Sequence, residues 1–414
     1  MLTPILIAGP GRSGTTLLMQ ILTGNPSVAC DREYPYENRY LTYYAKLARI
    51  LAAPSPRPEL NALQLHDYDD FHFGAVPWPA NRERKDQLAL AGDELFRLAW
   101  QELSARAAGA SHYAEKVPAW LPAWLRARLP SVTIHLVRDP RDLYLSAVAF
   151  LREKGLAQGF GRDATTSDVD HAKNLAHALL LYYENERAER RRDDVTRVRY
   201  EDLVTDRAGL ASRLSRMTGL QFPHAAGDDE LPRHRTSDSP QASIGRWRRE
   251  SLPPGVRETL ESLLDDLLLD NSYDPPLAAP APSFSLAAQL SHPANGRWSL
   301  LDDGFGVEVQ GPAAWIQKMH GAFAAESTSE VWACVRGVAG DHCALYWRGT
   351  RERFDEGRSV RVPFHPGEHW QIIRFVLRGH PCWHGTISQI RVDFFQEAIQ
   401  SGARGAVRWI RQVR

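Results

Sequence analysis

Cysteine is scarce in this sequence: 414 residues contain only Cys30, Cys334, Cys343 and Cys382. Four thiols over this length, none in a C-x-x-C arrangement, argue against a disulfide scaffold and predict a cytoplasmic, reducing environment. The chain also has no excess of positive or negative charge, because 50 Lys and Arg residues balance 50 Asp and Glu residues. Overall charge therefore gives no reason to expect a nucleic acid or membrane partner, and any basic site must be local.

Long hydrophobic runs are missing as well. No stretch approaches the ~20 apolar residues of a membrane-spanning helix. The first residues lead directly into PILIAGP, without the basic start and apolar core of a signal peptide. The chain is 43% hydrophobic and 24% charged, a composition typical of water-soluble globular proteins. We expect a soluble protein, of bacterial origin, without a membrane span.

Two regions of different composition follow each other along the chain. Residues 1–273 alternate short apolar runs, such as 4–9 and 132–138, with longer helical patterns, which predicts an α/β, P-loop-like fold with a central parallel sheet. Residues 274–296 are rich in Pro and Ala and indicate an extended linker. Residues 297–414 contain short runs rich in Val, Ile, Trp and Phe between Gly and Pro. That pattern predicts an antiparallel, jelly-roll-like β-sandwich.

The first apolar run ends in a glycine-rich loop, GPGRSGTT at residues 9–16, which leads into a helical pattern. Backbone N–H groups at a helix start, with the helix dipole behind them, form an anion site. The glycine spacing and the hydroxyl of Thr16 match a nucleotide-binding P-loop, but Thr15 replaces the lysine that reaches the β- and γ-phosphates. Arg12 is the only cation in the loop. The loop therefore predicts an anion site for a ligand other than an ordinary nucleoside triphosphate.

A second arginine stands at the end of another apolar run, in IHLVRDPRD. A nucleoside triphosphatase would need an aspartate at such a strand end to hold magnesium. Arg138 at this place predicts a second anion, and Ser146, about two turns into the following helix, could help to hold it. The alternative is that Arg138 pairs with Asp139 or Asp142 and that Ser146 packs within the helix.

These two segments and three others resemble, in order, the motifs of sulfotransferases that use 3′-phosphoadenosine 5′-phosphosulfate (PAPS). GPGRSGTTLL resembles the 5′-phosphosulfate loop, in the R-S-G-T-T form of tyrosylprotein sulfotransferases, and LVRDPRDLYLS resembles the 3′-phosphate motif. The other matching segments are YAEKVPAWL, RYEDLV and HRTSDSPQASIGRWRRE, the last similar to the loop that closes over the cofactor in bacterial and Golgi-type members. The resemblance covers residues 4–250 and leaves out the sandwich. It implies a phosphosulfate ligand and no metal, which suits a P-loop without its lysine.

The resemblance implies a role for each matching residue in binding the cofactor. The implied binding residues are Arg12, Ser13, Gly14, Thr15, Thr16, Arg138, Ser146, Tyr200 and Arg246. The first five belong to the 5′-phosphosulfate loop, and Arg138 and Ser146 would hold the 3′-phosphate. The tyrosine would contact adenine, and the last arginine would reach the 3′-phosphate from the closing loop. Trp247 next to it is expected either beside adenine or in the core, with the core favoured.

Sulfuryl transfer to a hydroxyl requires a base that takes the proton of the acceptor. In the family this base is often a glutamate shortly after the first helix, a position that falls here in CDREYPYENRY. Glu33 matches best and Glu37 is the alternative. Either carboxylate could instead be solvated, or could pair with Arg32 or Arg39.

The reaction also requires cations that stabilise the departing phosphate. The resemblance assigns this task to Arg12 and to Lys116 of the EKVP segment, which would face the sulfuryl group or the bridging oxygen. The alternative for Lys116 is a surface lysine beside Glu115. Arg12, Glu33 and Lys116 form the predicted catalytic set, for an in-line transfer without a covalent enzyme intermediate.

We therefore expect a PAPS-dependent sulfotransferase that modifies a carbohydrate or glycoconjugate hydroxyl and releases 3′-phosphoadenosine 5′-phosphate. The alternatives are a P-loop kinase or nucleotidase, and a non-catalytic glycan- or protein-binding protein on a degenerate nucleotide fold. The aromatic segments at 32–44 and 65–79 suit a sugar or a phenol, or an aromatic core. The sandwich is expected either to bind glycans through tryptophans or to serve structure and homo-oligomerisation.

Overall fold

The computed structural model of the chain forms two compact units, Met1–Leu47 with Glu94–Pro280 and Ala48–Asp93 with Ala281–Arg414. It describes all residues except 31–32, 34, 38, 51–84, 108, 223–235, 282–295, 302–303, 311–313, 319–321, 341, 351 and 397–402. Several predicted features therefore lie wholly or partly outside the described residues. Among them are parts of the aromatic segment at 32–44, including Arg32, the aromatic segment at 65–79, most of the linker at 274–296 and the first two residues of the HRTSDSPQASIGRWRRE segment.

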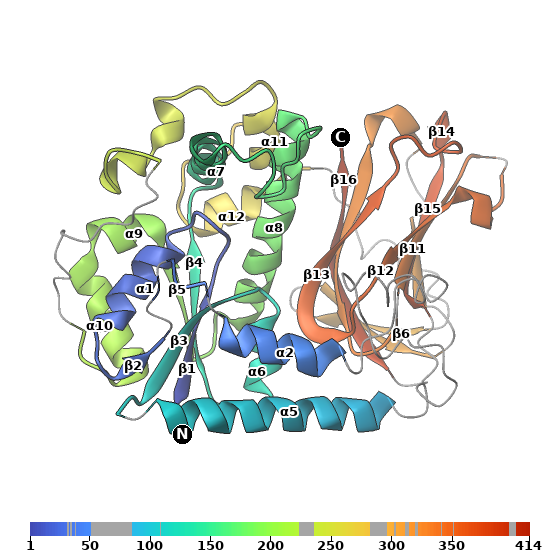
Figure 1. The fold of residues 1–414 in the computed structure, drawn as a ribbon. Coiled ribbons are helices and arrows are strands. Elements are labelled where there is room, and N and C mark those ends of the chain that lie inside the picture. The colour runs from blue at the N-terminus through green and yellow to red at the C-terminus, as the bar shows by residue number, and fades with distance from the viewer. Residues whose placement is uncertain are drawn as a thin grey trace. The chain divides into compact units, whose positions relative to one another are not determined.

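The first unit is built on a parallel five-stranded sheet (Figure 1). Its strands are β1 (Thr3–Ala8), β2 (Val28–Ala29), β3 (His112–Val117), β4 (Val132–Val137) and β5 (Val195–Arg199). Their order in the sheet is β2-β3-β1-β4-β5, and every neighbouring pair is parallel. The predicted α/β fold with a central parallel sheet is confirmed. The strands β2 and β3 are additions that the sequence pattern did not indicate.

Helices connect the strands and flank the sheet (Figure 1). Those before β5 are α1 (Thr15–Thr23), α2 (Tyr40–Ile50), α5 (Lys85–Arg106), α6 (Leu121–Arg126), α7 (Pro140–Lys154) and α8 (Asp168–Glu189). After β5 follow α9 (Tyr200–Thr205), α10 (Arg207–Thr218), the 3₁₀ turns η4 (Gln241–Ser243) and η5 (Arg246–Arg248), α11 (Val256–Leu263) and α12 (Asp265–Asp270).

Local sequence signals explain where α7 begins and ends. Asp139 caps its start by accepting the backbone N–H of Arg141, and Pro140 occupies the first helical position, where no N–H is needed. Gly155 ends the helix in the left-handed conformation at φ 63°. The RDPRD segment thus places a helix directly behind the arginine that follows β4.

The carboxyl ends of the strands bring predicted site residues to one edge of the sheet. The glycine loop follows β1, Lys116 is the second-last residue of β3, Arg138 follows β4 and Tyr200 follows β5. The carboxyl ends of parallel strands share an edge, where α/β proteins bind their ligands. Beneath this edge lies a core of buried apolar side chains from β1, α1 and β4: Ile5, Ile7, Leu18, Leu22, Ile134 and Leu136.

The second unit contains two larger antiparallel sheets (Figure 1). One has the order β13-β10-β16-β7-β6 and the other β12-β11-β15-β8. The strands are β6 (Gly296–Leu301), β7 (Gly304–Val309), β8 (Ala314–Lys318), β10 (Glu330–Gly337), β11 (His342–Arg348), β12 (Ser359–Pro363), β13 (Gly367–Val376), β15 (Gln389–Gln396) and β16 (Arg404–Val413). A separate pair joins β9 (Phe323–Ala324) to β14 (Thr386–Ile387), and 3₁₀ turns lie at η7 (Ala325–Ser327) and η8 (Glu356–Arg358).

The two larger sheets share one apolar core, which confirms the predicted sandwich. Val331 and Val335 of β10 and Phe375 of β13 belong to this core together with Leu345 of β11 and Phe394 of β15, and all five side chains are fully buried. Alternate residues of each strand point to the same face, so each sheet contributes every second side chain to the core.

The described tryptophans of the sandwich serve its packing. The buried ones are at most 8% exposed: Trp332, Trp347, Trp370 and Trp409. Trp298 and Trp383 are half-buried and pack against the core. The tryptophan side chains that the structure describes in this unit therefore form no exposed platform on which a sugar ring could stack.

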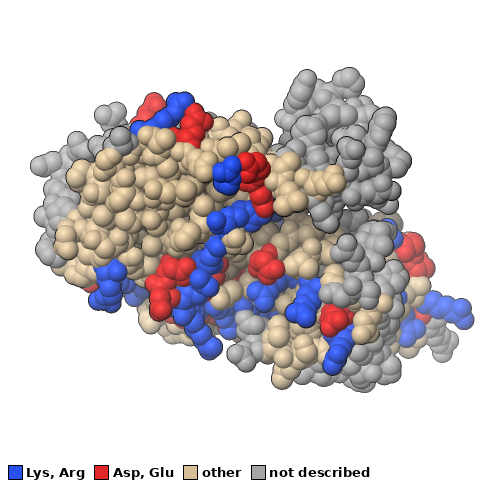
Figure 2. All heavy atoms as spheres, turned by 90° about the horizontal axis from the view of Figure 1, so that it is seen from below, with Lys and Arg blue, Asp and Glu red and all other residues tan. Residues whose placement is uncertain are grey.

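The surface carries both signs of charge. On the face shown in Figure 2, acidic side chains lie among the basic ones, as expected from equal numbers of the two. Among the helices formed by the described residues, none combines the length and the apolar character that crossing a membrane requires.

Candidate active site

The glycine loop between β1 and α1 has an unusual backbone that its packing explains. Arg12 and Gly14 both adopt positive φ, 70° and 97°, and the hydroxyl of Ser13 donates to the carbonyl of Pro10 at 2.7 Å. A Cβ atom at Gly14 would lie 2.5 Å from the ring of Tyr200. Only glycine therefore allows the loop to approach this ring, and the loop is fixed against the residue that follows β5.

The start of α1 offers backbone N–H groups to a ligand. Its N-cap is Gly14, which has no side chain to cap the helix. Thr15 is buried at 9% exposure, whereas Thr16 is half-buried beside it. The uncapped N–H groups, the helix dipole and these hydroxyls together suit a phosphate or sulfate group.

Arg138 is buried at this edge of the sheet, with only 4% of it exposed. Its guanidinium donates to the carbonyls of Arg12 at 2.8 Å and Ser243 at 3.0 Å, and it stacks 4.3 Å above the Tyr200 ring. Its Nε is buried and makes no hydrogen bond within the described residues. An orphaned donor on a buried guanidinium suits an anionic ligand.

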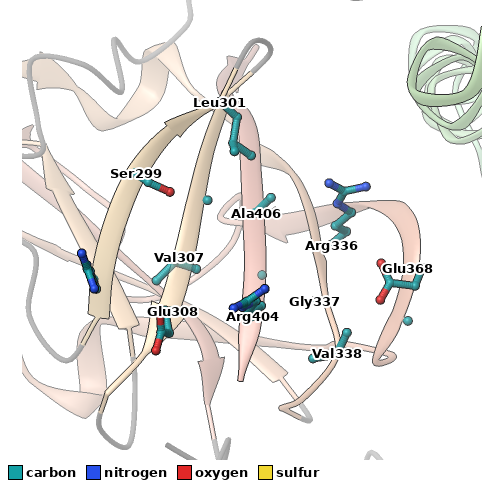
Figure 3. A pocket seen from close by; sticks show the side chains of 14 residues that line it. Ser299, Leu301, Val307, Glu308, Arg336, Gly337, Val338, Glu368, Arg404 and Ala406 are labelled. Atoms are coloured by element: carbon teal, nitrogen blue, oxygen red, sulfur yellow. The ribbon is translucent and has the colours of Figure 1, made fainter. Parts of the chain in front are cut away.

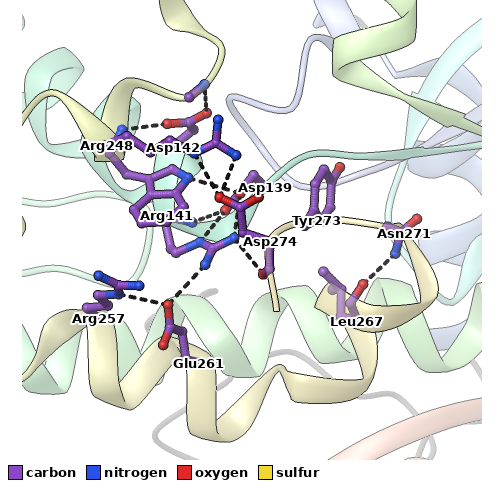
Figure 4. Close-up of polar contacts among 12 residues, drawn as sticks. Asp139, Arg141, Asp142, Arg248, Arg257, Glu261, Leu267, Asn271, Tyr273 and Asp274 are labelled. Carbon is purple, nitrogen blue, oxygen red and sulfur yellow. Dashed lines mark hydrogen bonds and ion pairs between the residues drawn. The ribbon is translucent and has the colours of Figure 1, made fainter. Parts of the chain in front are cut away.

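The structure does not show the alternative pairing of Arg138 with Asp139. Asp139 instead forms an ion pair with Arg141, whose Nη2 lies 2.9 Å from its carboxylate. A second ion pair, at 3.0 Å, joins Arg141 to Glu261 of α11 (Figure 4). The first carboxylate of RDPRD thus anchors α7, and Arg138 remains directed at the glycine loop.

Ser146 and Arg12 meet although 134 positions separate them in the chain. The Nε of Arg12 donates to the hydroxyl of Ser146 at 3.3 Å, and its Nη2 donates to the hydroxyl of Thr236 at 3.5 Å. The two hydroxyls lie 3.1 Å apart, and the guanidinium stacks 4.8 Å from the ring of Phe150. Arg12 therefore reaches a residue predicted for the 3′-phosphate. Thr236 belongs to the predicted closing segment, but its role was not foreseen.

The predicted closing segment, described from residue 236 to residue 250, contacts these residues. Arg246 donates to the carbonyl of Thr236 at 2.9 Å and forms an ion pair with Glu250. It is thus connected to Ser146 through Thr236. Trp247 stacks 3.9 Å from the guanidinium of Arg141, which favours the packing role over a contact with adenine.

Asp142 holds the closing segment on α7. Its carboxylate accepts the backbone N–H groups of Gly245 at 2.6 Å and Trp247 at 2.9 Å, and only 1% of the residue is exposed (Figure 4). Burial raises the pKa of Asp142, although the two N–H groups act in the opposite direction. These bonds fix the segment that carries Ser243 and Thr236, so Asp142 acts as a positioning residue.

We expect Asp142→Asn to weaken binding of adenosine 3′,5′-bisphosphate by about tenfold, because an amide offers only one acceptor oxygen to the two N–H groups and carries no charge. Titration calorimetry measures the affinity, and hydrogen exchange reports the protection of residues 236–250. The exposed Asp193→Asn is the matched control. Unchanged affinity and protection in Asp142→Asn would contradict the positioning role.

Lys116 is a buried cation held against the start of α1, at 5% exposure. Its ammonium donates to the hydroxyl of Thr16 at 2.8 Å, to the carbonyl of Pro35 at 2.6 Å and to Glu37 at 2.9 Å. Burial lowers the pKa of Lys116, and the bond to Glu37 opposes this. The alternative of a surface lysine beside Glu115 is therefore wrong.

Glu115 points away from Lys116 and caps α2. Its carboxylate accepts the backbone N–H groups of Leu41 at 2.7 Å and Thr42 at 2.9 Å, as well as the hydroxyl of Tyr113 at 3.0 Å. Burial raises its pKa, whereas these hydrogen bonds act in the opposite direction. Glu115 thereby fixes the start of the helix that follows the segment of Glu33 and Glu37.

The two candidate bases differ in their surroundings. Burial raises the pKa of Glu37, but Lys116 and Arg39 more than offset this and hold it below the usual range. Glu33 is exposed, and its carbonyl accepts the backbone N–H of Tyr36 at 2.7 Å. Glu37 is thus engaged by Lys116, while Glu33 lies on the same short segment.

Tyr200, predicted beside adenine, is buried at 8% exposure. Its ring packs against Gly14 and Arg138, and its hydroxyl lies 2.9 Å from that of Ser243. In this structure the ring therefore supports the glycine loop and the arginine. A contact with adenine stays a prediction.

A protein-family model and several solved structures are similar to parts of this chain. A sequence model described as "Sulfotransferase family" matches residues 4–224, more than half of the chain. No curated protein matches the chain. Among solved structures, a sulfotransferase domain from the curacin biosynthetic pathway is 17% identical, with a TM-score of 0.39, over 67% of this chain and 99% of that chain.

Two carbohydrate-binding modules also match a smaller part of the chain. The xylan-binding module CBM86 of Roseburia intestinalis is 8% identical over 32% of this chain and 95% of that chain, with a TM-score of 0.24. The module CBM6cm-2 of Cellvibrio mixtus lichenase 5A, solved with cellotriose, is 13% identical over 32% of this chain and 97% of that chain, also with a TM-score of 0.24. These similarities are too low to support a functional argument.

Proposed function

The chain belongs to the sulfotransferase family, and on that basis we propose that it transfers a sulfuryl group from PAPS to a hydroxyl of a carbohydrate or glycoconjugate. The observation that carries the choice of donor is the meeting of two arginines from different strand ends. Arg12 lies just before the uncapped start of α1. Arg138 donates to the backbone carbonyl of Arg12, and the side chain of Arg12 in turn donates to Ser146. Such a site suits a ligand with two anionic ends.

The residues present fit this donor. Arg138 and Ser146 would hold its 3′-phosphate, and the N–H groups of α1 with Thr15 and Thr16 would hold its 5′ end. The buried, orphaned Nε of Arg138 supports an anionic partner at this place. The closing segment would then cover the nucleotide, with Arg246 acting through Thr236.

When bound, PAPS would supply an activated sulfuryl group for transfer to the acceptor oxygen, with the phosphate as leaving group. Lys116, held against Thr16, would stabilise the charge that develops on the leaving phosphate. Arg12 would add a second positive charge. Orientation and electrostatic stabilisation then supply most of the rate enhancement.

Glu33 would take the proton of the acceptor hydroxyl. The pKa of Glu37 is depressed by its bond to Lys116, and a base with a depressed pKa accepts a proton less readily. Glu37 instead would keep Lys116 charged and in place. The two glutamates thus receive different tasks, which substitution can separate.

The proposal is tested by calorimetry with adenosine 3′,5′-bisphosphate, followed by incubation with sulfur-labelled PAPS and a panel of glycans, glycolipids and phenols. We expect one nucleotide to bind per chain without magnesium, and label to appear in a carbohydrate. Absence of nucleotide binding would contradict the donor. Binding without label in any acceptor would favour a non-catalytic protein, and label only in phenols would contradict the acceptor class.

A further inference from the structure

An open groove of about 770 Å³ crosses the outer face of the five-stranded sheet of the sandwich. Its lining comes from the five strands and their ends, and its charged side chains are Arg297, Glu308, Arg336, Glu368 and Arg404. Figure 3 shows Glu308 beside Arg404 in the groove, with Arg336 and Glu368 on its other side. The volume lies in the range of ~300–1,000 Å³ that is typical of ligand sites.

Strand register places three of these charges in one row. Arg297 of β6 is paired with Glu308 of β7, and Glu308 is paired with Arg404 of β16. Residues paired across neighbouring strands present their side chains on the same face. A guanidinium, a carboxylate and a second guanidinium therefore stand side by side along one edge of the groove.

The next row forms a low floor. Ser299 of β6 is paired with Gly306, Gly306 with Ala406, and Ala406 with Arg336 of β10. Small side chains thus separate the hydroxyl of Ser299 from the guanidinium of Arg336. An extended molecule could lie across this floor and contact charged groups on both sides.

The charged side chains that the structure describes in the groove are exposed or half-buried, and they do not form ion pairs with one another. Within the described part of the chain, the side chains of Arg297, Glu308, Glu368 and Arg404 form no hydrogen bond or ion pair. Arg336 stacks 4.9 Å from the buried ring of Trp370, a contact that orients the guanidinium and leaves its N–H groups available. The groove therefore presents both donors and acceptors.

We propose that this groove binds an acidic oligosaccharide. The arginines would form paired hydrogen bonds with its carboxylate or sulfate groups, and the glutamates and Ser299 would bind its hydroxyl groups. A bare polyphosphate would be repelled by Glu308 and Glu368, and the described residues that line the groove include no aromatic side chain to stack on nucleobases. An anion that is rich in hydroxyl groups can bind the arginines through its acidic groups and the glutamates through its hydroxyl groups. This inference is independent of the proposed sulfuryl transfer.

Titration calorimetry on the full-length protein, without nucleotide, tests the proposal with three hexasaccharides: an oligogalacturonate, a sulfated galactan and neutral cellohexaose. We expect an acidic hexasaccharide to bind about tenfold more tightly than the neutral one, or better, and salt to weaken its binding. The two acidic sugars distinguish carboxylate from sulfate as the recognised group. Binding of none, or equal binding of all three, overturns the proposal.

The double variant Arg336→Ala/Arg404→Ala should lower the affinity for the acidic sugar by about tenfold or more. Arg404→Glu is a second test that leaves the contact between Arg336 and Trp370 in place. Arg361→Ala, on β12 of the other sheet, is the matched control because this arginine is exposed but lies outside the groove. The proposal is overturned if Arg404→Glu and a folded double variant both bind the acidic sugar as tightly as the unmodified protein does.

Discussion

Arg12→Ala should reduce kcat/KM for sulfuryl transfer by about 10³-fold, because preorganised charge at the reacting group contributes the largest part of such catalysis. Arg12 supplies the only cation of the glycine loop, and its guanidinium contacts Ser146 and Thr236. The backbone bond from Arg138 to the carbonyl of residue 12 is retained in the variant. The loss therefore reports on the guanidinium itself, measured as label transferred from sulfur-labelled PAPS.

Two further variants complete this test. Arg12→Lys keeps a positive charge but loses the planar fork, so we expect an intermediate rate. Arg128→Ala removes an exposed arginine just after α6 and should leave the rate unchanged. A turnover rate of Arg12→Ala close to that of the unmodified protein would contradict the proposed role of the glycine loop in sulfuryl transfer.

Glu33→Gln should lower kcat by about 10²–10⁴-fold, the range expected when a general base is removed. Glu37→Gln should have a different effect, because Glu37 opposes the lowering of the Lys116 pKa by burial. Without Glu37, Lys116 loses its proton at lower pH, so the alkaline limb of the pH–rate profile moves to lower pH. Rates of both variants across the pH range measure the two effects.

The reverse outcome would exchange the two roles. Loss of the acidic limb and of most activity in Glu37→Gln, with near-normal turnover in Glu33→Gln, would identify Glu37 as the base. Glu258→Gln provides a control on α11, because it changes an exposed carboxylate outside the site. Circular dichroism then verifies that each variant is folded.

Part of the first sheet could be predicted, because β1 and β4 are short segments rich in apolar residues. The strand β3 could not, because its sequence HYAEKV contains two charged residues although all six are buried. Burial of Glu115 and Lys116 is compensated by partners that lie elsewhere in the chain, among them Leu41, Thr42 and Thr16. A local pattern cannot reveal such partners.

The site was predictable to a similar extent. The motifs predicted two anion-binding segments, and the structure brings their residues Arg12, Arg138 and Ser146 together. The tasks of Asp142 and Thr236 depend on contacts across 103 and 90 positions, and no short motif encodes such distances. The burial of the sandwich tryptophans could likewise not be predicted, because the sequence alone does not tell which face of a strand is covered.

The neighbouring residues Glu115 and Lys116 have a consequence for how this protein can vary. The carboxylate of Glu115 secures the start of α2, and the ammonium of Lys116 binds the hydroxyl of Thr16, on opposite sides of the same strand. Insertion or deletion of a single residue within β3 would move the side chains of Glu115 and Lys116 to the opposite faces of the sheet. We therefore expect natural variation in length to fall before the strand, in the connection from α5, and the strand itself to keep its six residues.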